Sequence, residues 1–151
     1  MAQSRAISTN IAEILAKVEA KLDGVKEQFL IEVAEDLVAQ GTSPVWSGHY
    51  ITSHSISTTS SGGQFTENLG GWTEKTSNPE AYRAEARANL MGNIASLPKG
   101  ADNIYISNNA PHARIVEYGG GNTSAYGVFS SVANRAGLHL QKAISKVKGG
   151  Q

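Results

Sequence analysis

The residues that could do chemistry in this chain are four histidines, many serines and scattered carboxylates. The histidines are His49, His54, His112 and His139. His49 and His54 are five residues apart in a segment that we interpret as a strand. Residues at that spacing point to opposite faces, so without a bulge the two cannot bind one metal ion. The spacing therefore predicts no metal site, and we interpret the histidines as surface residues.

The usual sequence signals of nucleophilic catalysis are missing. The chain has no Gly-x-Ser-x-Gly elbow and no Ser-x-x-Lys motif. The closest serine–histidine pairs are Ser53 and Ser55 around His54, all along one expected strand. Glu13 and Glu117 have no carboxylate partner nearby in sequence, although a distant partner would leave a paired-carboxylate site open. We therefore expect no catalytic residue, no cofactor and no metal ion.

Composition excludes further classes of protein. The 151 residues include no cysteine, which removes disulfide scaffolds, thiolate zinc sites and cysteine nucleophiles. Thirteen basic and thirteen acidic residues cancel, so there is no basic excess to attract nucleic acid. No apolar run approaches the roughly 18 residues that span a membrane. The N-terminal sequence lacks the apolar core of a signal peptide. The length suits a single domain over residues 1–151.

The elements that must position any site begin with a long helix over residues 10–40. Its apolar residues follow one another at spacings of 4, 3, 4, 3 and 4, a heptad-like stripe: Ile11, Leu15, Val18, Leu22, Val25 and Phe29. Asn10 and Glu13 resemble a capping box, and Gly24 is a point where the helix could divide in two. So long a stripe needs cover from its own domain or from a neighbouring subunit.

The rest of the chain alternates strand and helix patterns. We expect a strand at 49–60, a helix at 78–97, a strand at 103–107, a helical turn at 112–118 and a last helix at 126–147. Glycine and serine predict a flexible loop at 60–77 and a hinge at 119–125. These elements predict an α+β fold. It is a small mixed domain with a long N-terminal helix, a short β-sheet and a C-terminal helix.

Two segments carry a more specific signal. Residues 43–53, SPVWSGHYITS, resemble the T-P-V-D-T-G-x-L-R-x-S signature that follows a long first helix in the neck and tail-completion proteins of tailed bacteriophages. Residues 104–119, IYISNNAPHARIVEYG, resemble that family's V-Y-I-x-N-N-x-P-Y-A-x-x-V-E-Y-G. In the first segment Trp46 and Ser47 replace Asp-Thr, and His49 and Tyr50 replace Arg/Asn and Leu/Phe. The order and spacing of the other elements also fit this family.

The resemblance implies a structural virion protein and not an enzyme. Members of the family form rings at the head–tail junction, so the expected partners are further copies of the chain, as a hexamer or dodecamer, and virion proteins of the connector and tail. DNA would pass through the channel only as cargo, and no membrane would be involved. The chain would be made in the bacterial host cytoplasm and reside in the neck or tail of the virion. The alternatives are a tail terminator or minor tail protein elsewhere in the tail, and a small enzyme.

The candidate interaction residues come from the two segments and the loop between them. They are Trp46, His49, Tyr50, Trp72, Asn108, Asn109, Pro111, Glu117 and Tyr118. Two interpretations of the segments stay open: they specify the fold, or they contact a partner. Trp72 likewise either anchors the 60–77 loop on a neighbouring subunit or fixes it to its own domain.

Overall fold

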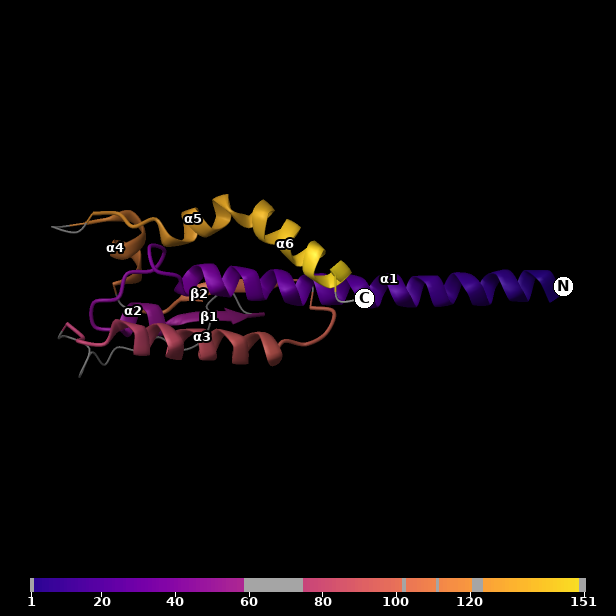
Figure 1. Cartoon of the computed structure of the whole chain (residues 1–151), viewed down its shortest axis with the longest axis horizontal. Helices are drawn as coiled ribbons and strands as arrows, with labels where there is room; N and C mark the ends of the chain where they lie inside the picture. The colour runs from indigo at the N-terminus through magenta and orange to yellow at the C-terminus, as the bar shows by residue number, and fades with distance from the viewer. Residues whose placement is uncertain (1, 59–74, 102, 111, 121–123, 150–151) are drawn as a thin grey trace.

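Six helices and two strands make up the described part of the chain (Figure 1). The computed structural model describes residues 2–58, 75–101, 103–110, 112–120 and 124–149, with side chains from Glu19 onward. The elements are α1 (Ala2–Val38), α2 (His49–Thr52), β1 (His54–Ser57), α3 (Pro79–Ala95), β2 (Tyr105–Asn108), α4 (Ala113–Tyr118), α5 (Val128–Asn134) and α6 (Ala136–Gly149). This mostly helical domain with a short antiparallel sheet confirms the expected fold class. Among the described residues, no helix has both the length and the apolar character needed to cross a membrane.

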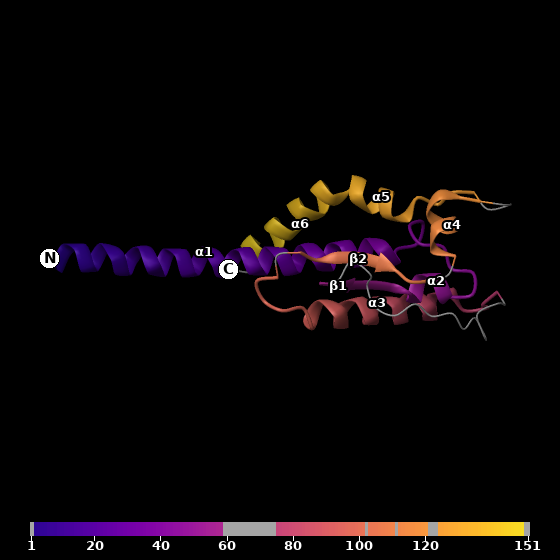
Figure 2. The same cartoon turned by 180° about the vertical axis from the view of Figure 1, so that it is seen from behind.

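Helix α1 is the axis of the domain. Its C-terminal half packs against α6 on one side and α3 on the other (Figures 1 and 2). The apolar face that it buries recurs at the spacings of a globular helix: Leu30, Val33, Ala34, Leu37 and Val38. Leu90 and Ile94 of α3, Ile56 of β1 and Val132 of α5 belong to the same core. The two layers on either side of α1 therefore share one apolar centre.

The expected start of α1 is wrong, because the helix begins at Ala2 and not at Asn10. The possibility that Gly24 divides the helix is settled too: α1 continues through it. A Cβ at Gly24 would lie 3.9 Å from Cγ1 of Val147, so α6 packs directly beside the glycine. A glycine inside a helix costs about 1 kcal/mol relative to alanine. The packing of α1 against α6 offsets that cost and keeps the helix continuous.

The segment expected to be one strand is a helical turn followed by a shorter strand. Residues 49–52 form α2, and only His54–Ser57 form β1, which pairs antiparallel with β2. Two hydroxyls close the turn: Thr52 Oγ1 donates to the Gly48 carbonyl at 2.7 Å, and Ser53 Oγ donates to the His49 carbonyl at 2.6 Å. Such local side-chain bonds offer the backbone an alternative to a sheet ladder. They explain why the alternating pattern did not extend the strand.

Gly48 opens α2 in a conformation that only glycine adopts easily. Its φ is +92°, and a Cβ there would lie 2.5 Å from ring atoms of Tyr82 on α3. We expect Gly48→Ala to lower the free energy of unfolding by about 2 kcal/mol or more, because strain and overlap add. Gly41→Ala is the control, since Gly41 has φ +85° but open space around its Cα. Urea unfolding of both variants tests this, and equal losses would contradict a role for Tyr82.

The C-terminal helix is interrupted. The sequence predicts one helix over 126–147, whereas α5 ends at Asn134 and α6 begins at Ala136. Arg135 between them leaves helical geometry, and its guanidinium pairs with Asp36 on α1.

Helix α3, by contrast, begins as expected: Asn78 caps it by accepting from the Ala81 amide at 3.2 Å, and Pro79 follows. The capping residues of α3 were sufficient to predict where it begins, whereas the break after α5 depends on Asp36, a partner far away in sequence.

Candidate functional site

The two segments that carry the family resemblance meet at one end of the domain, opposite the N-terminus of α1. The ends of α2 and α4 lie there (Figures 1 and 2). Asn108 ties the segments together: its Nδ2 donates to the Tyr50 carbonyl at 2.8 Å, and its Oδ1 accepts from the Ala110 amide at 2.9 Å. The Asn109 amide donates to the Ser53 carbonyl at 3.4 Å. Residues about sixty positions apart thus form one packed unit.

A buried serine–histidine–asparagine chain runs through this unit. Ser43 Oγ lies 2.9 Å from Nε2 of His54, and Nδ1 of His54 lies 3.2 Å from Nδ2 of Asn108. Because the other bonds of Asn108 fix its amide orientation, Nδ2 is a donor and Nδ1 of His54 must accept. The proton of the neutral ring is then on Nε2 and is donated to Ser43. In this tautomer Nε2 has no lone pair with which to take a proton from Ser43, and the lone pair of the ring is on Nδ1, where it accepts from Asn108.

This geometry therefore supports a structural role for His54 and not that of a general base. Nucleophilic catalysis needs the histidine nitrogen nearest the serine to be free of a proton. Ser43 and His54 are also buried, at 1% and 4% exposure, so no substrate reaches them. The serines next to His54 in sequence are not its partners, and Ser43 comes instead from the turn that follows α1.

The interpretation of the histidines as surface residues is wrong for three of the four. His49, His54 and His139 are buried, and His112 is half-buried. Tyr50 lies among the rings, 5.1 Å from His54 and 6.2 Å from His112 between ring centroids. Burial lowers the pKa of His54 to about 4, and it lowers the pKa values of His49 and His112 too. These rings hold the end of the domain together in their neutral form.

Tyr50 contributes its ring and not its hydroxyl to this packing. The side chain is buried, and its hydroxyl has no hydrogen-bond partner among the described residues. Burial and the nearby charge of Glu117 raise the pKa of the phenol. The hydroxyl therefore stays protonated at neutral pH.

Glu117 joins α4 to the start of α5. Its two carboxylate oxygens accept the backbone amides of Phe129 and Ser130, at 3.1 Å and 3.0 Å. These are amides at a helix start, which lack partners within the helix, and a negative charge there is favourable. Glu117, on α4, thus fixes where α5 begins.

We expect Glu117→Gln to lower the free energy of unfolding by about 1 kcal/mol, because one acceptor and the negative charge are lost at the start of α5. Glu85→Gln on the solvent-exposed side of α3 is the matched control and should change stability by less than about 0.5 kcal/mol. Denaturant midpoints of the two variants give the comparison. Equal midpoints would show that the carboxylate of Glu117 does not cap α5.

Exposed apolar side chains lie at the same end of the domain. Trp46, three residues before α2, is 55% exposed, and Tyr118 at the end of α4 is 75% exposed. Ile115 and Tyr126 are also largely exposed, and the guanidinium carbon of Arg114 lies 5.9 Å from the Tyr118 ring centroid. We call this surface the aromatic end; it consists of three aromatic residues and one isoleucine, namely Trp46, Tyr118, Tyr126 and Ile115. Exposed aromatic residues are typical of protein interfaces.

The candidate interaction residues therefore divide into two groups. Trp46 and Tyr118 are exposed and available to a partner, whereas His49, Tyr50, Asn108 and Glu117 hold the backbone that presents them. Asn109 is half-buried and bonds to the turn after α2. Trp72 and Pro111 lie outside the described residues, as does most of the expected loop and part of the expected hinge.

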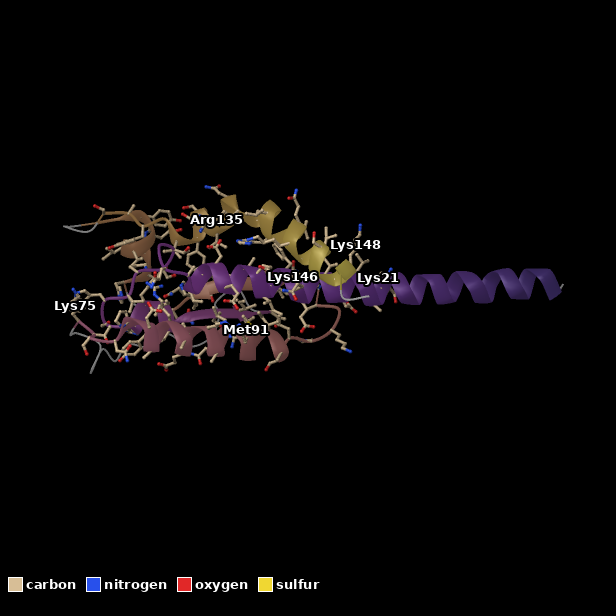
Figure 3. The ribbon with its side chains drawn as sticks, viewed as in Figure 1. Lys21, Lys75, Met91, Arg135, Lys146 and Lys148 are labelled. Atoms are coloured by element: carbon tan, nitrogen blue, oxygen red, sulfur yellow. The ribbon has the colours of Figure 1, made fainter. Side chains whose placement is uncertain are left out.

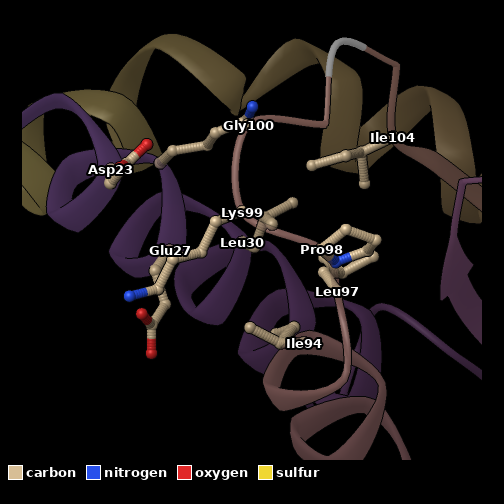
Figure 4. A pocket seen from close by; sticks show the side chains of 10 residues that line it. Asp23, Glu27, Leu30, Ile94, Leu97, Pro98, Lys99, Gly100 and Ile104 are labelled. Carbon is tan, nitrogen blue, oxygen red and sulfur yellow. The ribbon is translucent and has the colours of Figure 1, made fainter. Parts of the chain in front are cut away.

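A small pocket lies at the other side of the domain, between α1 and the turn after α3 (Figure 4). Leu30, Ile94 and Ile104 form its apolar floor, and Asp23 and Glu27 stand at its mouth. Its volume of about 100 Å³ is far below the several hundred Å³ typical of ligand pockets. It offers room for water molecules and not for a substrate or cofactor.

Several charged side chains of the domain form ion pairs between elements. Lys146 of α6 bonds to Glu32 of α1, and Arg135 bonds to Asp36, on the side where α6 covers α1 (Figure 3). Among the described residues, no group of three or more metal-ligating side chains is arranged to hold an ion.

One buried cluster was not suggested by the sequence at all. Asp36 of α1 accepts from Arg135 at 2.7 and 2.8 Å, from Nε2 of His139 at 2.7 Å and from Thr42 at 3.0 Å. Burial alone would raise the pKa of Asp36, but these hydrogen bonds outweigh it and lower the pKa to about 2. Only its position next to the apolar stripe of α1 could have suggested a buried carboxylate.

Comparison of the chain with protein families, with curated proteins and with solved structures found no match in any of the three.

Proposed function

We propose that this protein is a structural subunit of a tailed-bacteriophage virion that forms a ring at the head–tail junction and joins the capsid connector to the tail. Its partners in this proposal are further copies of itself and the neighbouring connector and tail proteins. DNA passes through the channel as cargo. The role is one of assembly and not of catalysis.

The observation that carries the proposal is the packing of the two resembling segments on each other. Residues 43–53 and 104–119 resemble the family signatures separately, and the fold joins them through the bond of Asn108 to the Tyr50 carbonyl and of the Asn109 amide to the Ser53 carbonyl. If both segments carry the signature of one fold, they are expected to pack on each other in this way. The unit also presents the aromatic end to solvent, which gives a neck protein a surface for its neighbours.

The experiment is antibody labelling of intact particles from the source phage, with mass spectrometry of the same preparation. We expect the chain in purified particles and the label at the head–tail junction. Label along the tail or at its far end would instead favour a tail terminator or minor tail protein. Absence of the chain from particles would overturn any virion role.

The aromatic end supplies a second test. We expect particles made with a Trp46→Ala/Tyr118→Ala double variant to show at least a tenfold loss of joined heads and tails, since exposed aromatic anchors often dominate binding. Replacing exposed residues of α3, as in Glu85→Ala/Ala88→Ser, is the control and should leave joining unchanged. Counting free heads and tails by electron microscopy gives the result. Normal joining by the double variant would remove the aromatic end from the proposal.

A further inference from the structure

The N-terminal half of α1 is a long stretch that no other described element covers. In both views it continues as a rod beyond the ends of α3 and α6 (Figures 1 and 2). Gly24 lies beside Val147 of α6, Asp23 still lines the pocket next to the turn after α3, and Leu22 just beyond is 62% exposed. We call residues 2–22 the rod. Most helical stability in proteins comes from packing of an apolar face, so a partner that covers the rod would stabilise it.

A stripe with coiled-coil spacing begins in the rod and runs on as far as Phe29, beyond which α1 does not keep it. In a heptad the step from d to a is four residues and the step from a to d is three. The 4, 3, 4, 3, 4 spacing therefore assigns one register without ambiguity. The d positions are Ile11, Val18 and Val25, and the a positions are Leu15, Leu22 and Phe29. A strict 3.5-residue repeat is typical of helices that supercoil with others of the same kind.

The buried half of α1 follows a different pattern. Leu30, Val33, Ala34 and Leu37 recur at the spacings by which a helix packs into a globular core. The change of period falls after Phe29, within the part of α1 that packs on the domain, so the heptad-like stripe runs from the covered part into the rod. The rod's stripe is thus suited to other helices and not to a sheet or a pocket.

We propose that the rods of three or more copies of this chain pack in parallel as a helical bundle. Leucine at a with β-branched residues at d disfavours two-stranded coiled coils and favours bundles of higher order. Ala12 at e and Ile14 at g widen the apolar seam, as a larger bundle requires. Cyclic symmetry of three or more copies makes all rods point the same way. This inference is independent of the proposed function, which requires only that copies contact one another.

The test measures the mass of the full-length chain in solution by sedimentation velocity and light scattering. We expect an assembly of three or more chains at micromolar concentration, and a monomer for Leu15→Glu/Leu22→Glu. The matched control adds the same two charges at b and f positions, as Ala16→Glu/Ala20→Glu, and should assemble like the unaltered chain. A monomeric or dimeric unaltered chain would overturn the proposal, and so would assembly of the Leu15→Glu/Leu22→Glu variant.

Orientation is tested by cross-linking, because the chain has no cysteine of its own. Ser8 continues the a positions, so Ser8→Cys should form disulfide-linked dimers on mild oxidation if the rods are parallel and in register. Thr9→Cys at the following b position should not. Failure of Ser8→Cys to cross-link within an assembled sample would overturn the parallel arrangement. Labelling of virions at the neck would still support the proposed function, so the two failures are distinguishable.

Discussion

Asp36→Ala is expected to lower the free energy of unfolding by about 3 kcal/mol. The carboxylate is 8% exposed and accepts hydrogen bonds from Arg135, His139 and Thr42. Its removal leaves the imidazole of His139 and part of the guanidinium of Arg135 without an acceptor inside the domain. Breaking a buried pair by removing one partner typically costs several kcal/mol, and the partial exposure of Arg135 keeps the expected loss at the lower end.

Glu35→Ala is a control from the adjacent position. Glu35 also pairs with an arginine, Arg87, at 2.7 Å, but the two side chains are 41% and 54% exposed. Exposed pairs contribute about 0–1 kcal/mol, so we expect Glu35→Ala to change stability by less than about 1 kcal/mol. Urea denaturation compares the variants directly when both are fitted with one slope of unfolding free energy against urea concentration. Similar losses at the two positions would show that burial of the Asp36 cluster does not matter.

The fold class and the longest elements were predictable because their signals are local. The stripe on α1, the Asn78-Pro79 start of α3 and the short strand before Asn108 each depend on residues within a few turns of one another. Caps, apolar period and β-branched content act over that range whatever the tertiary partners are. The general order of helices and strands followed from them.

The buried polar contacts were not predictable because their partners are far apart in sequence. Asp36 and His139 are 103 residues apart, and Ser43 and His54 are 11 apart across a turn. A lone histidine in sequence carries no sign of which carbonyl or carboxylate the fold will bring to it. The break at Arg135 has the same origin, since its guanidinium pairs with the carboxylate of Asp36, which is 99 residues away in sequence. The candidate site was thus found as a set of residues, but its division into buried supports and exposed contacts needed the structure.

His54 is expected to make the domain acid-sensitive in a definite pH window. Its pKa is about 4 in the fold, where burial disfavours the charged ring, against about 6.5 in an unfolded chain. Between those values the unfolded chain binds a proton that the native chain does not. The stability from the neutral ring is therefore fully present above pH 6.5 and is lost as the pH falls toward 4, by about 3 kcal/mol in total.

The measurement is the slope of unfolding free energy against pH for the unaltered chain and for His54→Gln. From pH 6 to pH 5 the unaltered chain should lose about 1.2 kcal/mol more than the variant, which approaches the value of about 1.4 kcal/mol per pH unit for one proton. His49 and His112 shift in the same direction and remain in both proteins, so the difference isolates His54. Protonation of Asp36 lowers the free energy of unfolding only as the pH falls from 3.8 toward 2, outside this window. Equal slopes would mean that His54 is not held neutral by the fold, and the tautomer that excludes it as a base toward Ser43 would lose its support.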